Sequence, residues 1–237
     1  TAFSSGTLTL TTGADGIASF SDLVLNEADS YILEFSAVGV VTSAVSASFD
    51  VTAAVADPAQ TTASVPINGT AGEVTNISVT VEDAFGNPVD NAEGNIALGI
   101  TTGPNSGGTF TTVTAEGSGV YSTGYTPTAS GTDEISITLG GTGISGSPYS
   151  STVSAAAASS LIVVSGSGQS AEINQTLASP FVVQVNDAFG NPVVGESVGF
   201  SITGAPVDAA GQSLSATPVL TDLNGQASAT LTLGNKT

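Results

Sequence analysis

Apolar and polar residues alternate along much of this chain, in short runs separated by Gly, Pro, Asn and Asp. The pattern is clearest in the middle, at Ile77, Val79 and Val81, at Ile96, Leu98 and Ile100, and at Ile135, Ile137 and Leu139. A period of two residues places one row of side chains on a buried face and is typical of a β-strand. Between residues 59 and 155 it predicts strands at about 60–66, 74–82, 94–101, 109–114, 119–125, 133–139 and 147–154. Strands at this spacing, parted by turn residues, predict an all-β sandwich.

The residues on either side show the same alternation over shorter stretches. In residues 1–54, we expect strands at 7–11 and 17–20 around an Asp15-Gly16 turn, then at 31–35 and 45–51. Asp-Gly between alternating runs is a strong hairpin signal. The residues expected to point inward are Tyr31, Leu33, Phe35, Phe49 and Val51. After residue 160, the alternating residues are Phe181, Val183, Val185, Val198, Phe200, Ile202, Ala229, Leu231 and Leu233.

One stretch of seven residues occurs twice, letter for letter. Asp83-Ala84-Phe85-Gly86-Asn87-Pro88-Val89 returns as Asp187-Ala188-Phe189-Gly190-Asn191-Pro192-Val193, an offset of 104 residues (187 − 83). Three late turns recur at a similar spacing, and their glycines are Gly16, Gly119 and Gly225. A repeat at this distance is domain-sized and predicts an array of similar modules.

The repeat period divides the chain into three modules. We predict the C-terminal part of a module at residues 1–54, a complete module at 55–155, and a module without its last strands at 156–237. Pro58 marks the first boundary because proline cannot donate to a ladder, and residues 154–159 read as an extended linker. The third module has no counterpart of about Asp29–Ala54. This predicts either a window of a longer array or strands supplied by a neighbouring chain.

The charge balance narrows the range of partners. The chain has 20 acidic residues and one basic residue, Lys236, which gives a formal net charge of −19. Nucleic acid is nearly excluded as a partner, because binding a polyanion requires Lys and Arg. Membrane contact is not expected either, since anionic lipid repels an acidic chain and no apolar run is long enough to span a bilayer. Such self-repulsion is best tolerated where salt screens it, which points to an extracellular location.

The chain contains no Cys, Met, Trp or His. Imidazole or thiolate metal sites and Ser-His-Asp or Cys-His nucleophiles are therefore impossible. Glu82 and Asp83 are neighbours on a strand and point to opposite faces, so they do not form a glycosidase pair. We predict no enzyme and no catalytic, cofactor-binding or metal-binding residue. Calcium is the one cofactor left open, although neither an EF-hand loop nor a Gly-rich calcium repeat is present. Its available oxygen ligands include Glu82, Asp83, Asp133, Glu134, Asp187 and Asp222.

The heptapeptide lies between two strands and is predicted to form a turn. Its Asp should cap backbone amides, its Gly should supply a positive φ, and its Pro should end the ladder. We expect Phe85 and Phe189 to plug the end of the sandwich. Tyr31 is a candidate tyrosine corner, although the aligned place in the middle module holds Asp133.

Several stretches resemble known families. The middle module resembles the filamin-type immunoglobulin-like (Ig-like) repeat, through residues 83–88, Gly119–Thr128 and Ile144–Tyr149. The first and third segments resemble the Ig-like repeats of bacterial invasin and intimin adhesins, through Asn186–Val193 and Thr221–Ala227. The resemblance covers nearly the whole chain and implies a rod or stalk of a secreted or surface protein.

These observations predict tandem Ig-like β-sandwich modules in an extended rod. The expected role is a structural repeat region, a stalk or spacer, of a large cell-surface protein of adhesin type. Its partners would be neighbouring modules of the same or an identical chain. Two alternatives stay open: a subunit of an extracellular filament with strand exchange between neighbours, and modules that bind a receptor or carbohydrate directly. Glycosylation matters only if the source modifies asparagine, and its sequons begin at Asn68, Asn76, Asn174 and Asn235.

Overall fold

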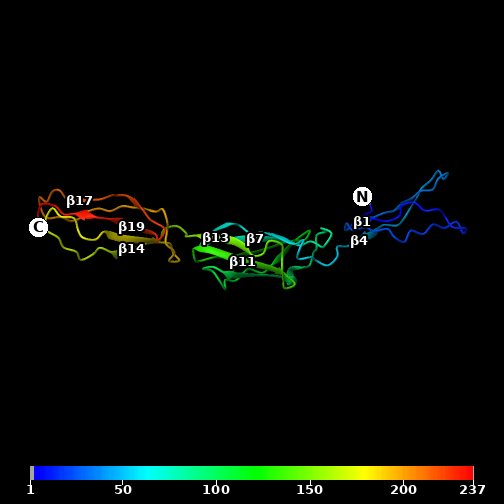
Figure 1. Cartoon of the computed structure of the whole chain (residues 1–237), viewed down its shortest axis with the longest axis horizontal. Coiled ribbons are helices and arrows are strands. Elements are labelled where there is room, and N and C mark those ends of the chain that lie inside the picture. Colours follow the sequence, from blue (N-terminus) through cyan, green and yellow to red (C-terminus); the bar gives the residue numbers. More distant parts are fainter. Residues whose placement is uncertain (1–2, 237) are drawn as a thin grey trace.

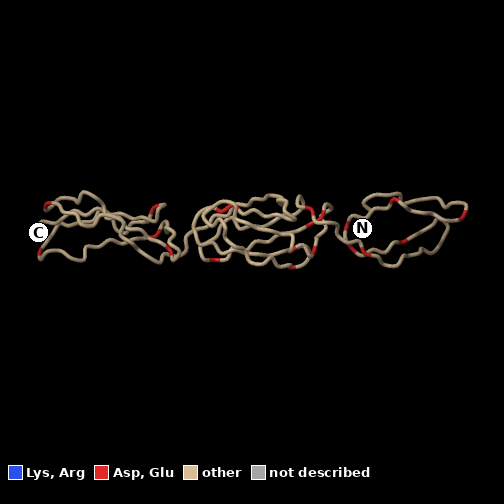
Figure 2. The backbone as a smooth tube through the Cα atoms, turned by 90° about the horizontal axis from the view of Figure 1, so that it is seen from below, with Lys and Arg blue, Asp and Glu red and all other residues tan. Residues whose placement is uncertain are grey.

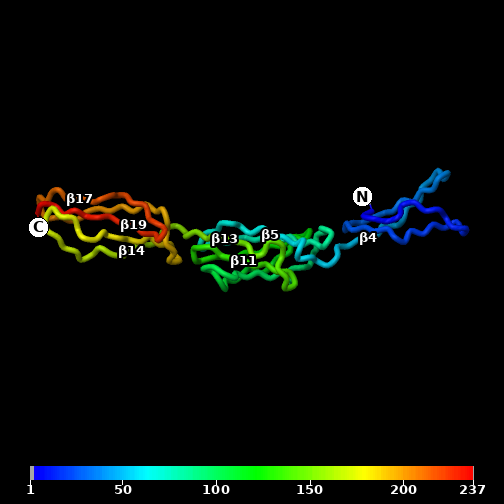
Figure 3. Tube along the Cα trace, viewed as in Figure 1, coloured from blue at the N-terminus to red at the C-terminus, as the bar shows by residue number. Residues whose placement is uncertain are grey.

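The computed structural model describes residues 3–236 as three β-rich segments that follow one another along the chain (Figure 1). We refer to residues 3–53, 54–155 and 156–236 as the first, middle and third segments. Within the described residues, the one helical element is the 3-10 turn η1 (Glu93–Asn95), so the all-β fold class is confirmed. A single stretch of chain passes from one segment to the next (Figure 3). The limits of the three modules remain a prediction.

The middle segment is a sandwich of two sheets. One sheet has the strand order β5 (Thr62–Ser64), β7 (Thr75–Thr80), β10 (Val120–Tyr125) and β9 (Thr114–Gly117). The other has the order β12 (Thr142–Gly143), β11 (Gly131–Leu139), β13 (Tyr149–Ser154) and β6 (Asn68–Thr70), and β8 (Ile96–Thr102) also pairs with β11. All these pairs are antiparallel except β6 with β13. Two facing sheets of mainly antiparallel strands, with this strand number, are typical of an Ig-like sandwich.

The predicted alternating residues form the core of the middle segment. Ile77, Val79, Val81, Ile135 and Ile137 each expose no more than 1% of their surface. Burying one such side chain contributes about 1.5–3 kcal/mol. The middle segment therefore has a hydrophobic core of its own.

Some strands of this sandwich differ from the predicted ones. The ladder expected at 109–114 begins only at Thr114, and Phe110 joins Tyr125 through an isolated bridge. β6 reads Asn68-Gly69-Thr70, which has no apolar residue, so alternation cannot predict it. It forms because its backbone pairs with β13, and that pairing depends on the tertiary structure.

The third segment has a smaller core. A sheet of β14 (Ser160–Ser165), β15 (Phe181–Asn186) and β19 (Gln226–Ala229) is joined by two short pairs. These pairs are β16 (Ser197–Val198) with β18 (Val219–Leu220), and β17 (Ser213–Leu214) with β20 (Leu231–Thr232). Val185, Val198 and Ala227 are buried at its centre, as the alternation predicts for the two valines, but Ile202 is 39% exposed and does not point inward as expected.

The first segment pairs fewer strands than predicted. β1 (Asp29–Tyr31) pairs with β4 (Phe49–Val51), and β2 (Glu34–Phe35) pairs with β3 (Ala44–Val45). The strands predicted at 7–11 and 17–20 are wrong, because these residues have no ladder partner. The turn between them is closed by a hydrogen bond from the Gly13 N–H to the Ile17 carbonyl (2.8 Å). The prediction that Phe35 and Phe49 point inward is also wrong, since 44% and 37% of their surfaces are exposed.

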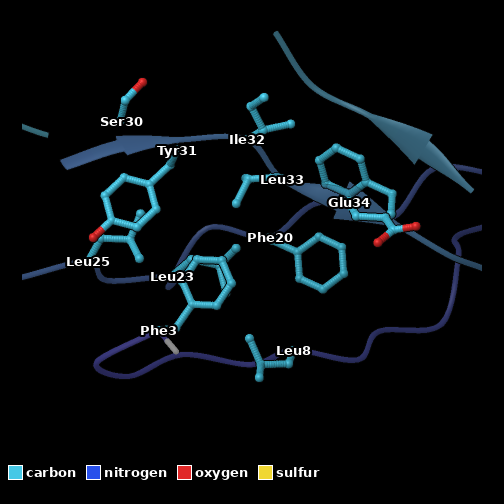
Figure 4. Close-up of a pocket in the computed structure, with 11 residues that line it drawn as sticks. Phe3, Leu8, Phe20, Leu23, Leu25, Ser30, Tyr31, Ile32, Leu33 and Glu34 are labelled. Atoms are coloured by element: carbon cyan, nitrogen blue, oxygen red, sulfur yellow. The ribbon is translucent and has the colours of Figure 1, made fainter. Parts of the chain in front are cut away.

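An open hollow of about 360 Å³ occupies the centre of the first segment. Figure 4 shows Phe3, Leu8, Phe20 and Leu23 on one side of it and Tyr31 with the residues that follow it on the other. Tyr31 is the one buried apolar residue described in this segment, and its ring stacks on Phe49 with 6.0 Å between the ring centroids. No helix in residues 3–236 is long and apolar enough to cross a membrane.

Candidate functional site: the two segment junctions

The first heptapeptide folds into the predicted turn between the first and middle segments. The Asp83 Oδ1 atom accepts hydrogen bonds from the backbone N–H groups of Phe85 (2.8 Å) and Asn87 (2.9 Å). Gly86 has a φ of 84°, and its N–H donates to the Asp83 carbonyl (3.0 Å). An Asp side chain that bonds its own backbone two residues on, followed by a residue of positive φ, is a common way to close a tight turn.

The second heptapeptide repeats this geometry. Asp187 Oδ1 accepts from the N–H groups of Phe189 and Asn191, both at 2.8 Å, and Gly190 has a φ of 89°. Pro88 and Pro192 each take part in an isolated bridge and not in a longer ladder, as expected of a residue without an N–H group. The roles predicted for the Asp, Gly and Pro positions are therefore confirmed in both copies.

The second carboxylate oxygen of each Asp holds the linker. Asp83 Oδ2 accepts from the Ala54 N–H (2.8 Å), and Asp187 Oδ2 accepts from the Ala156 N–H (2.9 Å). Both Asp side chains are buried, with 0% and 3% of their surfaces exposed. Each turn thus fixes the stretch of chain that enters its own segment.

The heptapeptide asparagine reaches the preceding segment. The Asn87 side chain donates to the Asn26 carbonyl (2.7 Å) and accepts from the Ala28 N–H (2.8 Å). Its Nδ2 also donates to Asp83 Oδ2 (2.8 Å), so one side chain joins the turn to the other segment. We call this pair, Asp83 with Asn87, the junction clamp.

The second junction clamp, Asp187 with Asn191, makes the same contacts. Asn191 Nδ2 donates to the Thr128 carbonyl and to Asp187 Oδ2, both at 2.8 Å, and Asn191 Oδ1 accepts from the Ser130 N–H (2.8 Å). The sequence predicts only a local turn here and misses the contact between segments. The one signal for it is that the Asn is kept in both copies, although a turn with Gly beside it does not require Asn.

Hydrogen bonds hold both clamp carboxylates in the charged form. Burial alone raises the pKa of Asp83, but the bonds from Asn87, Ala54 and Phe85 outweigh it and lower the pKa to about 2. For Asp187, burial again acts upward, and the bonds from Asn191, Ala156 and Phe189 lower the pKa below its ordinary value. N–H donors thus surround each carboxylate, and bonds to the charged form favour that form.

The predicted late turns pack against the heptapeptides. Gly119 has a φ of 71°, and a Cβ atom there would lie 2.9 Å from Pro88 Cβ and 2.6 Å from the Val81 carbonyl oxygen. Gly225 repeats this contact, with 2.9 Å to Pro192 Cβ and 2.7 Å to the Val185 carbonyl oxygen. The repeated Gly and the repeated Pro therefore belong to one site, which the equal spacing suggested but could not place in space.

The predicted role of the heptapeptide phenylalanines is wrong. Phe85 is 60% exposed and Phe189 is 48% exposed, so neither plugs a sandwich. The Phe189 ring instead lies against Gly72 of the middle segment, where an added Cβ would meet two ring atoms at 2.7 Å. The turn points this side chain out of its own module and toward the neighbouring one.

The six candidate calcium ligands do not come together. Asp133 is buried within the middle segment, and its carboxylate accepts from Asn105 Nδ2 (2.8 Å) and from the Tyr125 hydroxyl (3.2 Å). Asp222 caps the late turn of the third segment, and Glu134 accepts from the Ser150 hydroxyl (2.5 Å). Within residues 3–236, no three acidic side chains are grouped to hold a metal ion.

Acidic residues nevertheless gather on both sides of the first junction (Figure 2). The second junction differs, because a hollow of about 300 Å³ opens beside the linker there. It is lined by Ser130, Val153, Ser154, Ala155, Pro192, Val193, Val194 and Leu223. Mainly small apolar groups line it, and they offer no set of convergent polar atoms for a ligand.

The chain is similar to two groups of known proteins, filamin-type repeats and bacterial adhesins. Residues 55–150 match the family model of the filamin/ABP280 repeat. The fold is similar to FdeC, an Escherichia coli adhesin (TM-score 0.55, 23% identity, over 79% of this chain and 59% of that chain). It is also similar to Yersinia pseudotuberculosis InvD (0.54, 17%, 98% and 68%) and to invasin, a bacterial integrin-binding protein (0.52, 17%, 95% and 44%).

These matches confirm the predicted resemblance and fold class. Residues 55–150 are similar to a filamin-type repeat, and the chain shares the Ig-like fold of bacterial adhesins. The chain spans about 59% of the FdeC structure that it matches. No curated protein matches the sequence.

Proposed function

We propose that this chain is a structural repeat region, a stalk or spacer, of a large secreted or cell-surface protein of adhesin type. The observation that carries the proposal is the junction clamp, which joins consecutive segments in the same way at both junctions. The clamp asparagine of one segment is bonded to the backbone of the preceding segment, which restricts the rotation of one segment relative to the other. A spacer requires this restriction to keep its length. The partners of each module are then its neighbours in the chain.

The comparisons support this proposal through the fold alone. Adhesins with Ig-like modules share the architecture, and their function resides in particular surfaces and not in the fold. Invasin is an integrin-binding protein, but the hollows of the first segment and of the second junction are lined mainly by apolar side chains. We therefore place the spacer role ahead of direct binding to a receptor or carbohydrate.

Small-angle X-ray scattering with light scattering for mass tests the spacer role. The experiment compares the chain with the double variant Asn87→Ala/Asn191→Ala and with Asn76→Ala, an exposed asparagine on β7. We expect an elongated monomer, and a broader distribution of interatomic distances in the double variant only. A chain that already scatters as freely jointed segments, or a double variant that scatters like the wild type, contradicts the proposal.

A second candidate function, strand exchange between copies, is favoured by the edge of the third segment. β14 pairs only with β15, and its four apolar residues, Leu161 to Val164, are between 46% and 65% exposed. An apolar edge strand is a template for a strand of another chain. Light scattering over a concentration series should then show growth that Val163→Lys prevents, whereas a constant monomer mass removes this candidate.

A further inference from the structure

The clamp asparagines contact only backbone atoms of the preceding segment. Asn87 contacts residues 26 and 28, and Asn191 contacts residues 128 and 130, an equal offset of 102 residues (128 − 26). We call 26–28 and 128–130 the receiving loops. Neither loop lies in a strand, so no sheet ladder holds its carbonyl and N–H groups in place. Other contacts must therefore hold these backbone groups in the positions where the clamp asparagine can bond them.

In the middle segment, this support comes from Asn105. Its Oδ1 accepts from the N–H groups of Thr128 and Ala129, both at 2.9 Å, and its Nδ2 donates to the Ala129 carbonyl (2.8 Å). The same Nδ2 donates to Asp133 Oδ2 (2.8 Å), and Asp133 Oδ1 accepts from the Asn105 N–H (3.1 Å). The amide of Asn105 thus uses both donors and both lone pairs, which fixes its orientation.

In the first segment, a different residue holds the equivalent place. The Tyr31 hydroxyl donates to the Glu27 carbonyl (2.8 Å), and Glu27 corresponds to Ala129 at the same offset of 102 residues (129 − 27). Tyr31 stands where the middle segment has Asp133. Burial, with the nearby charges of Glu27 and Asp29, raises the pKa of Tyr31, so its hydroxyl stays protonated and donates. Two different side chains, Tyr31 and Asn105, therefore bond the carbonyl at the equivalent position of the two receiving loops.

We infer that Tyr31 and the Asp133-supported Asn105 are positioning residues of the two junctions. Each one orders the receiving loop from the core of its own segment, so that the following clamp asparagine finds a preformed acceptor and donor. A continuous chain of hydrogen bonds then runs from buried Asp133 through Asn105, the loop 128–130 and Asn191 to Asp187. This inference rests on the proposed spacer function, because it explains how the spacer keeps its geometry.

The test measures alignment of the segments by NMR residual dipolar couplings in the whole chain. In the wild type, the middle and third segments should share one alignment tensor. Asn105→Ala should remove the common tensor of these two segments, and Asn105→Ala/Asn191→Ala should have no larger effect than Asn191→Ala alone. Tyr31→Phe should do the same to the first and middle segments. It removes only a hydroxyl, so it tests the inference even if Asn105→Ala unfolds the middle segment.

Matched controls separate positioning from simple stability. Tyr149→Phe removes another hydroxyl that bonds a carbonyl four residues earlier, that of Ser145, away from both receiving loops. Tyr149→Phe should leave every alignment tensor unchanged. The effects of Asn105→Ala and Asn87→Ala should be independent in the double variant, because the two residues act at different junctions. The inference is overturned if Tyr31→Phe or Asn105→Ala lowers the melting temperature but leaves the tensors common. If the wild-type segments share no alignment tensor, the result contradicts the proposed spacer function and not only this inference.

Discussion

The two junctions of this chain combine the same clamp with different surroundings. On the downstream side, the heptapeptides are identical, and each Asp and Asn makes the same bonds. On the upstream side, the receiving loops are Asn26-Glu27-Ala28 and Thr128-Ala129-Ser130, which differ at all three equivalent positions. The clamp contacts backbone atoms, which every residue type provides, so only one side of the junction needs a fixed sequence. Both junctions therefore have the same contact between segments, although only the heptapeptide side of that contact has the same sequence in both.

The support behind the loops differs most. A tyrosine hydroxyl holds the first loop, and an Asn–Asp pair holds the second. A second difference is that Phe189 rests on Gly72, whereas Phe85 is the more exposed ring. Substitution of the junction Asp, Gly and Phe residues should have effects that decrease in that order, and acid acts on the first junction through Asp83.

Asp187→Ala and Asp83→Ala should have the largest effect, and the two should be equal. Each change removes the acceptor of two turn N–H groups, one linker N–H group and one Asn side chain. Leaving buried donors unpaired costs about 1–3 kcal/mol each, with partial relief from water, so we expect a loss of about 3 kcal/mol. Urea unfolding measures it. Asp222→Ala, which removes an exposed turn cap, should cost less than about 1 kcal/mol.

Gly225→Ala and Gly119→Ala should come next. A Cβ at either position meets a carbonyl oxygen and the heptapeptide proline, and the backbone has a positive φ. We expect a loss of about 2 kcal/mol for each, from strain of about 1 kcal/mol and overpacking of about 1 kcal/mol. Gly16→Ala is the matched control, since its φ is 76° but nothing lies within 4 Å of its Cβ. Equal losses at Gly16 and Gly225 in thermal unfolding would show that the contact with proline adds nothing.

Phe189→Ala should cost more than Phe85→Ala. The Phe189 ring covers Gly72, so its removal exposes apolar surface on both segments and should cost about 1 kcal/mol. Phe85 is 60% exposed, and its removal should cost less than about 0.5 kcal/mol. Urea unfolding compares them. A larger loss from Phe85→Ala would reverse the stated difference between the junctions.

Acid should weaken the first junction as the pH falls from the ordinary carboxylate pKa toward the lower pKa of Asp83. The pKa of Asp83 in the folded chain is about 2, against an ordinary value of 3.8. Because the folded value is the lower one, the carboxylate stabilises the fold fully above about pH 4, and this contribution disappears as the pH falls toward 2. The difference in unfolding midpoint between the wild type and Asp83→Ala should therefore shrink from pH 5 to pH 2. A constant difference would contradict the assignment.

Alternation predicts much of the fold where a second sheet covers the strands. Ile77, Val79 and Val81 are buried as expected, because the facing strands of the middle segment bury one side of β7. The same reasoning fails for residues 7–11, which alternate equally well, and for residues 17–20, because neither stretch has a ladder partner. A strand is stable only with a neighbour, and the sequence of the strand does not show whether a neighbour is present.

The site was predicted as a turn and observed as a junction. The Asp, Gly and Pro roles follow from local turn chemistry, so residues 83–89 and 187–193 were sufficient to predict them. The outward direction of Phe189 and the reach of Asn191 depend on where the previous segment lies. Neither local propensity nor spacing contains that information.

The repeat, the all-β class and the turn that each heptapeptide forms can be predicted from the sequence, because all three follow from periods and from the conformational preferences of Asp, Gly and Pro. In contrast, the folded chain is needed to show that Asn87 and Asn191 join consecutive segments and that Tyr31 and Asn105 bond carbonyls at equivalent positions. The physical reason is that these asparagines contact backbone atoms from distant parts of the chain. A backbone carbonyl has no identity in the sequence, so its partner becomes visible only once the chain is folded.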